Sequence, residues 1–143
     1  MARILLLEDD KRARETFVDA FKLMGHESVA CAGVRDAIAE YDGNGRVDII
    51  VSDLNLENTR DKGGFRFFEH VDGKDPWQAF IMMTGNPELL SDEEKKKLAG
   101  HGAVLLGKPF GFEDMQRAIG DLLAKRPLQD ARARGSSSEV LDI

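Results

Sequence analysis

The chain has a single cysteine, Cys31, and no long hydrophobic run. One cysteine excludes an internal disulfide, and no closely spaced set of Cys and His residues suggests a zinc site. No apolar stretch approaches the ~20 residues that cross a bilayer. The apolar run at the N-terminus ends at Leu7 and meets three acidic residues, which is not typical of a signal peptide. We therefore expect a cytoplasmic protein that does not bind membranes.

Basic residues are scarce relative to acidic ones. The sequence has 20 Lys and Arg against 26 Asp and Glu, a formal net charge of −6. Because affinity for nucleic acid depends on neutralising phosphates, no nucleic-acid partner is expected. The 143 residues fit one domain. We expect it to occupy residues 1–125, because the periodic pattern stops at Arg126 and residues 126–143 have the composition of a polar, flexible tail.

Apolar runs and helical stripes alternate five times along the chain. This alternation is typical of parallel strands joined by right-handed helical crossovers, with helices on both faces of the sheet. We expect a flavodoxin-like (βα)5 fold of strand order 2-1-3-4-5, in which the first and third strands are neighbours at the sheet centre. The expected strands are 4–7, 28–32, 47–52, 79–83 and 103–106, and the expected helices are 11–24, 34–41, 64–71, 88–99 and 112–123.

Polar residues follow four of the five expected strands. Glu8 and Asp9 follow the first, Asp53 ends the third, Thr84 follows the fourth and Lys108 follows the fifth. Parallel strands bring their carboxyl ends to one edge of the sheet, so these side chains should meet there. Taken alone, each has a simpler reading as a turn, cap or solvated residue. Their ordered recurrence favours a site for a cation and a phosphoryl group.

The acidic residues of this edge suggest both a nucleophile and a metal site. A carboxylate such as that of Asp53 can attack phosphorus and form an acyl phosphate. Glu8, Asp9 and Asp53 would repel one another unless a cation neutralises them, and hard oxygen ligands suit Mg²⁺. Asp10 is instead expected to cap the first helix, because it directly precedes Lys11. Lys108 offers a compact charge for a phosphoryl oxygen, and Thr84 offers a hydroxyl donor.

The ordered set resembles the receiver domain of two-component response regulators over residues 2–125. The matching segments are Leu-Leu-Leu-Glu8-Asp9-Asp10, Val-Ser-Asp53-Leu-Asn55, Met-Met-Thr84-Gly85 and Gly107-Lys108-Pro109-Phe110.

The resemblance implies that Asp53 is the phosphorylated residue. It implies that Mg²⁺ is bound directly by Asp9, by Asp53 and by the backbone carbonyl of Asn55, with Glu8 acting mainly through water. The phosphoryl group would be contacted by Thr84 and Lys108.

The implied partners are a histidine kinase or histidine phosphotransfer protein and a downstream target protein. The chain would be a stand-alone phosphoacceptor and not an enzyme, as a monomer or weak homodimer.

The sequence departs from the family pattern in two places. Glu57 and Asp61 stand where a Pro and a Gly are usual, and Gly63-Gly64 come later, which suggests a short insertion within 58–62. Leu105 stands where the family usually has an aromatic switch residue, and we expect this leucine to stay buried in a short strand. The helix expected over 88–99 has little apolar stripe and should be solvated and loosely held.

Two other functions remain open from the residues alone. A haloacid-dehalogenase-like phosphohydrolase also uses a strand-end Asp, Thr, Lys and Mg²⁺, but it needs a second Asp where this chain has Asn55. A pseudo-receiver would bind partners without phosphorylation. The intact acid pair, Asp53, Thr84 and Lys108 argue against the pseudo-receiver, and Leu105 with the altered loop argues weakly for it.

Overall fold

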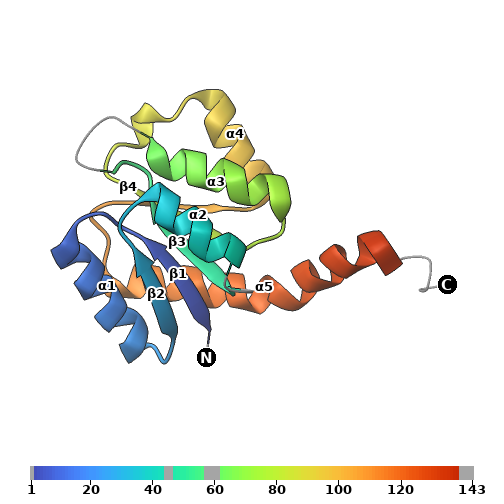
Figure 1. Ribbon diagram of the computed structural model, residues 1–143, viewed down its shortest axis with the longest axis horizontal. Coiled ribbons are helices and arrows are strands. Elements are labelled where there is room, and N and C mark those ends of the chain that lie inside the picture. Colours follow the sequence, from blue (N-terminus) through green and yellow to red (C-terminus); the bar gives the residue numbers. More distant parts are fainter. Residues whose placement is uncertain (1, 44–46, 57–61, 139–143) are drawn as a thin grey trace.

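A computed structural model describes residues 2–43, 47–56 and 62–138, with side chains as far as residue 125. The chain alternates strands and helices as the sequence predicts (Figure 1). The elements are β1 (Arg3–Leu7), α1 (Lys11–Leu23), β2 (Glu27–Cys31), α2 (Val34–Gly43), β3 (Ile49–Asp53), α3 (Gly63–Lys74), β4 (Phe80–Thr84), the 3-10 turn η1 (Pro87–Leu89), α4 (Asp92–His101), β5 (Val104–Gly107) and α5 (Phe112–Ser138).

The five strands form one parallel sheet in the order β2-β1-β3-β4-β5, which confirms the predicted fold. β1 pairs with β3, and their last paired residues are Leu7 and Ser52. β3 pairs in turn with β4, with Asp53 opposite Met83. The carboxyl ends of the three central strands therefore lie side by side, and residues that follow them share one edge.

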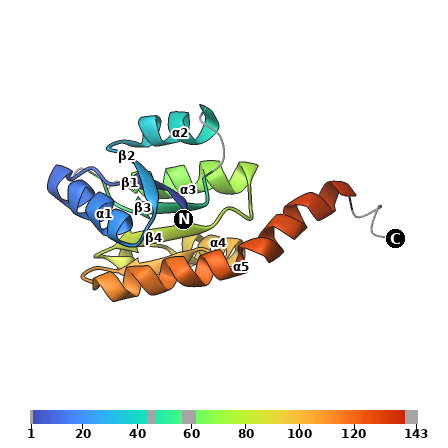
Figure 2. The same ribbon diagram turned by 90° about the horizontal axis from the view of Figure 1, so that it is seen from below.

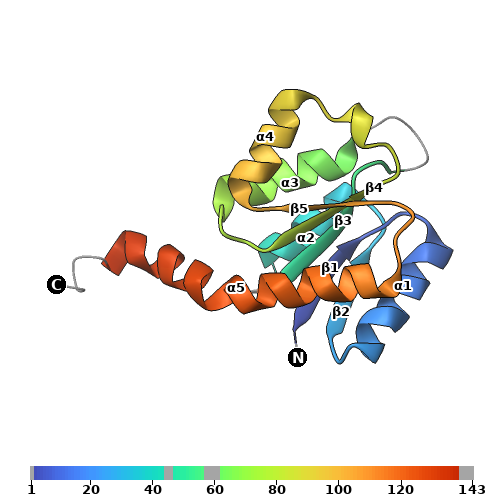
Figure 3. The ribbon, with the colours of Figure 1, turned by 180° about the vertical axis from the view of Figure 1, so that it is seen from behind.

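Each face of the sheet is covered by helices (Figures 2 and 3). α2 and α3, with Leu98 of α4, pack on one face around strand residues such as Leu5 and Ile50. α1 and α5 pack on the other face around Ile4 and Val51. Because strands covered on both faces bury every side chain, β3 and β4 are buried throughout and read as continuous apolar runs.

Local signals set the ends of α1. Asp10 caps it as expected, since its carboxylate accepts a hydrogen bond from the amide of Ala13 at 2.8 Å. Gly25 follows the helix with φ +88°, a conformation that glycine adopts without a steric penalty. The only cysteine, Cys31, ends β2 as a buried free thiol, and burial raises its pKa to about 11.

α4 begins later than the sequence pattern indicates. The expected helix over 88–99 is divided into η1 and α4, with Leu90 extended between them, because Ser91 and Glu94 form a capping box that starts the helix at Asp92. Among the described residues of α4, Leu98 alone is buried. α4 therefore packs against the rest of the domain with little apolar surface, as the sequence predicts.

Polar contacts hold the C-terminal end of α4. The side chain of His101 is 1% exposed. Its Nδ1 lies 2.7 Å from the Asp72 carboxylate, at the end of α3, and its Nε2 lies 2.6 Å from the carbonyl oxygen of Gln78. The ring also meets Phe68 edge-on. His101 is thus a packing residue that ties α4 to the end of α3 and to the approach to β4.

Leu105 is not buried, contrary to the sequence expectation. It is 38% exposed. Its neighbours Val104 and Leu106 pack on the face covered by α5, so alternation along the strand turns Leu105 toward the α4 side. Since α4 contributes so little apolar surface there, this leucine stays partly exposed to solvent.

α5 continues beyond the globular part of the molecule as far as Ser138 (Figure 1). Met115, Ala118, Ile119 and Leu122 pack this helix against the sheet. Residues 126–138, expected as part of a polar tail, are helical; a flexible tail separate from the domain stays a prediction. Among the described residues, no helix has the length and apolar character needed to cross a membrane.

Candidate phosphoacceptor site

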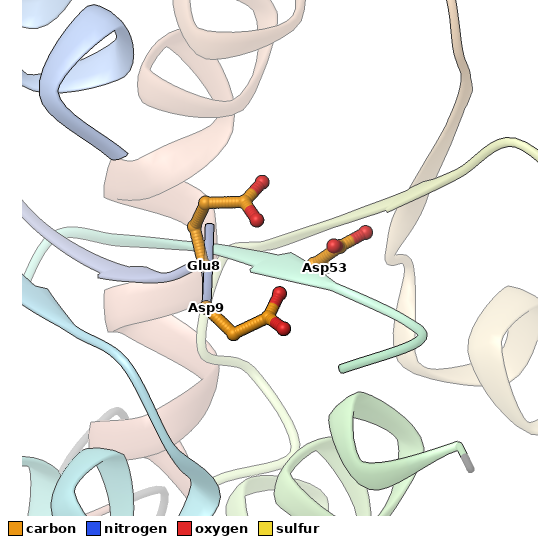
Figure 4. A group of neighbouring side chains, drawn as sticks. All are labelled: Glu8, Asp9 and Asp53. Atoms are coloured by element: carbon orange, nitrogen blue, oxygen red, sulfur yellow. The ribbon is translucent and has the colours of Figure 1, made fainter. Parts of the chain in front are cut away.

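Three carboxylates meet where the central strands end. Glu8 and Asp9 directly follow β1, and Asp53 is the last residue of β3. Figure 4 shows the Glu8 and Asp9 side chains on the side facing Asp53, and one carboxylate oxygen from each residue lies within 4.8 Å of the others. Glu8 is 2% exposed and Asp53 8% exposed. The pairing of β1 with β3 therefore produces the acidic cluster that the sequence predicts.

Lys108 supplies the counter-charge. Its Nζ lies 3.2 Å from Oδ1 of Asp53 and 3.5 Å from Oε1 of Glu8. The residue directly follows β5, two strands from β3, and its amide donates to the carbonyl of Thr84 at 2.7 Å. The Lys108–Pro109 peptide is cis. One ammonium thus bridges both buried carboxylates.

The surroundings of Glu8 and Asp53 in the acidic cluster raise the pKa of both carboxyl groups. Burial raises the pKa of Glu8, and the Asp53 carboxylate raises it further, which outweighs the lowering effect of Lys108. Burial likewise raises the pKa of Asp53; Lys108 lowers it, and Asp9 raises it. Both carboxyl groups therefore hold protons more tightly than ordinary side chains, because one lysine does not compensate for burial and mutual repulsion.

Thr84 and Asn55 occupy the same edge. Thr84 ends β4 opposite Gly107 of β5, and it is buried. Its Oγ1 accepts a hydrogen bond from the amide of Asn86 at 2.9 Å, which is the local contact typical of a strand-end threonine. A hydroxyl has one donor and two acceptor positions, so this contact leaves the O–H able to donate. Asn55 lies half-buried two residues beyond Asp53.

Comparison with known sequences decides the family. The sequence profile of the response regulator receiver domain matches residues 4–120, most of the chain. The chain belongs to the response regulator receiver family. No curated protein matches the chain significantly.

Solved receiver domains share the fold. The chemotaxis response regulator CheY4 of Vibrio cholerae is similar, with 27% identity, a TM-score of 0.70, and coverage of 86% of this chain and 99% of its own. A receiver domain from Clostridium thermocellum has 19% identity, a TM-score of 0.77, and coverage of 90% and 98%. The beryllofluoride-activated receiver domain of DrrB has 20% identity, a TM-score of 0.67, and coverage of 87% and 98%.

Arg14 supports the acidic end of β1 in this receiver domain, a contact that the sequence pattern did not reveal. Its Nη1 donates to the carbonyl oxygens of Glu8 at 3.0 Å and Asp9 at 3.1 Å. The guanidinium therefore fixes the backbone that carries the two acids. In the sequence, the position of Arg14 on α1, one turn after Asp10, could have indicated this contact. An arginine on the surface of a helix, however, usually points into solvent.

Gly64 packs directly against the backbone of Asp53. A Cβ built on Gly64 would lie 1.8 Å from the Asp53 carbonyl oxygen and 2.9 Å from Cα of Leu54. The Gly64 amide also donates to the Leu54 carbonyl at 3.0 Å. The suggested insertion within 58–62 lies outside the described residues except for Lys62. Gly64 nevertheless fills a place where only glycine fits.

We predict that Gly64→Ala destabilises the domain, because the added methyl group meets backbone atoms that have no room to yield. Overpacking of this kind costs about 1–3 kcal/mol or more in the free energy of unfolding. Gly73→Ala, also in α3, is the matched control, since its Cβ would meet nothing within 4 Å. That change should be neutral or stabilise the helix by roughly 0.5–1 kcal/mol. Urea denaturation of both variants checks the prediction, and equal stabilities would contradict it.

Proposed function

We propose that this receiver domain accepts a phosphoryl group on Asp53 from a phosphohistidine of a histidine kinase or phosphotransfer protein. The observation that carries the proposal is the Asp53 carboxylate at the end of the central strand, 3.2 Å from Lys108 and within 4.8 Å of the Glu8 and Asp9 oxygens. A structural ion pair needs one acid for one lysine. Here two buried carboxylates, those of Glu8 and Asp53, share Lys108, which is costly unless a ligand uses them.

The transfer makes one bond and breaks one. A carboxylate oxygen of Asp53 forms a bond to phosphorus as the P–N bond of the donor imidazole breaks. The departing nitrogen keeps the electron pair and takes up a proton, which leaves a neutral histidine and an acyl phosphate. Such a transfer depends on positioning and on neutralising the phosphoryl oxygens more than on covalent assistance.

The chain's own residues divide these tasks. Lys108 already contacts Asp53, and its ammonium is a compact donor that can move to a phosphoryl oxygen. The Thr84 hydroxyl can donate to a second oxygen while it still accepts from the Asn86 amide. Arg14 holds the backbone of Glu8 and Asp9. We assign these residues binding and orienting roles.

The acidic cluster fits Mg²⁺. Its oxygens are hard ligands, and the raised pKa values of Glu8 and Asp53 signal a charge imbalance that a divalent cation corrects. Asp9 and Asp53 would bind the ion directly, with the Asn55 carbonyl, and Glu8 would act mainly through water. When bound, Mg²⁺ supplies positive charge beside the phosphoryl oxygens.

We predict that incubation with acetyl phosphate and Mg²⁺ adds one phosphoryl group to the wild-type chain, because a small donor needs only the receiver's own site. Asp53→Asn should add none, since the amide is not a nucleophile. Intact-mass spectrometry measures both. Ser52→Ala is the control, because among the described residues its buried hydroxyl donates to the neighbouring Asp53 carbonyl alone. An unmodified wild type would favour the pseudo-receiver, and phosphorylated Asp53→Asn would move the site elsewhere.

We predict that Mg²⁺ stabilises the fold more at pH 7.5 than at pH 5. The folded pKa values of Glu8 and Asp53 lie above their ordinary values of 4.5 and 3.8. Between the ordinary and the folded pKa values, the unfolded chain has already ionised while the folded state still holds its protons, so rising pH increasingly destabilises the fold. A cation offsets that cost only when the carboxylates are ionised. The measurement is the Mg²⁺-induced shift in melting temperature at each pH.

Asp9→Asn should weaken Mg²⁺ binding about tenfold or more in the same melting experiment. The exposed Asp121→Asn on α5 is the control for a general loss of acidic charge. A Mg²⁺ effect independent of pH, or equal in Asp9→Asn and wild type, would contradict a cation site at this cluster.

We also propose that the output of this receiver domain is atypical. Leu105 has no polar edge and is already 38% exposed, so it lacks the two discrete positions of an aromatic switch. Phosphorylation would then be read by residues 55–64 and by the segment of η1 and α4.

We predict that beryllofluoride, which mimics the acyl phosphate, causes its largest amide chemical-shift changes at residues 55–64 and 85–100. Changes at residues 103–106 and in α5 should be small, because Leu105 does not change position. Spectra of the chain with Mg²⁺ and with Mg²⁺ plus beryllofluoride provide the comparison. A response concentrated on β5 and α5 would show instead that Leu105 serves as an ordinary switch.

A further inference from the structure

Lys62 connects two segments that flank the site. It directly precedes α3, and its Nζ donates to both carboxylate oxygens of Glu94, at 2.8 and 3.1 Å, and to the carbonyl oxygen of Leu89 at 3.2 Å. An ammonium has three N–H donors, and here each has an acceptor. The side chains of Lys62 and Glu94 are 31% and 20% exposed, so water competes for this contact less than at an open surface.

On the α3 side, the backbone of Lys62 is held close to Asp53. Its carbonyl accepts from the amides of Phe65 at 3.0 Å and Arg66 at 3.3 Å, in the first turn of α3. That turn contains Gly64, which packs without clearance against the Asp53 carbonyl. Lys62 therefore has a defined place relative to the phosphoacceptor strand.

On the other side, Lys62 binds the segment that runs from Thr84 to α4. The Asn86 amide donates to the Thr84 hydroxyl at 2.9 Å, and the Asn86 carbonyl accepts from the amide of Leu89 at 3.0 Å. Glu94 closes the capping box of α4, since its carboxylate also accepts from the Ser91 amide at 2.8 Å. A single nitrogen thus binds both the end of η1 and the carboxylate that organises the start of α4.

We propose that Lys62 is a positioning residue that couples Thr84 to α4, so that a shift of the Thr84 hydroxyl toward a phosphoryl group on Asp53 moves the first turn of that helix. This inference rests on the proposed phosphorylation of Asp53. The ion pair that carries the coupling, Lys62–Glu94, lies outside the acidic cluster and is not part of β5.

The hydrogen bonds of Thr84 explain why the coupling operates. Its hydroxyl can donate to a phosphoryl oxygen while it continues to accept from the Asn86 amide, so the Asn86 peptide follows the hydroxyl. Asn86 and Leu89 belong to one hydrogen-bonded turn, and Leu89 moves with it. Because Lys62 holds Leu89 and Glu94 together, the displacement reaches α4. Without Lys62, the extended residue Leu90 can absorb the change.

The test compares amide chemical-shift changes caused by Mg²⁺ and beryllofluoride in variants of the 143-residue chain. In Lys62→Met the changes at residues 92–98 should fall by roughly half or more, as expected when an energetic coupling is removed. Changes at residues 54, 55 and 84 should persist, because the acidic cluster is untouched. Lys62→Arg, which keeps the charge and the donors, should restore the α4 response. Glu94→Gln should lose it, because the ion pair is gone.

The control is a second ion pair, which joins α3 to α4. Lys97 Nζ lies 3.0 Å from Oε2 of Glu69, with side chains 56% and 47% exposed. Lys97→Met should respond as the wild type does. A full α4 response in Lys62→Met, or an equal loss in Lys97→Met, would overturn the coupling role. A wild type that shows no beryllofluoride response at residues 54 and 55 would instead refute phosphorylation of Asp53, and the coupling with it.

Discussion

The parallel pairing of β1 with β3 is the constraint on which the rest of the structure depends. It places the end of one strand, followed by Glu8 and Asp9, beside the end of another, Asp53. Carboxylates in such a place are kept apart in most folds, because burial and repulsion both oppose their ionisation. Here the apolar burial of β1, β3 and β4 on both faces fixes the strands and forces the acids together. Stability of the sheet thus maintains an electrostatically unfavourable cluster, the one that we propose binds a cation and a phosphoryl group.

Most of the fold could be predicted from the sequence because it follows from periodic burial. The runs before Glu8 and Asp53 indicate buried strands, and their alternation with helical stripes predicts the order that the sheet adopts. The exceptions are elements without a strong apolar pattern. α4 starts at its capping box at Ser91 and not at Glu88, and Leu105 is exposed because the helix beside it offers little apolar cover. The helix propensity of the sequence did not indicate that α5 continues to Ser138.

The site residues divide in the same way. The meeting of Glu8, Asp9, Asp53 and Lys108 could be predicted because each lies at or just after the end of a strand, and the topology alone brings strand ends together. Contacts between segments with no shared pattern were not predictable. Arg14 reaches the carbonyls of the acid pair, and His101 reaches Asp72 and Gln78 across 29 and 23 residues. Such bonds depend on the final packing of helices, so a single sequence carries no signal for them.

The buried thiol of Cys31 has a practical consequence for following motion in this receiver domain. Thiolate is the form that reacts with maleimides and iodoacetamide, and Cys31 is buried with its pKa raised by burial to about 11, so we expect it to react slowly at neutral pH. A cysteine introduced on the exposed side of α4, as in Lys96→Cys, would then be the one accessible thiol in the folded protein. A fluorophore or spin label attached there would report the movement of that helix without any need to replace the natural cysteine.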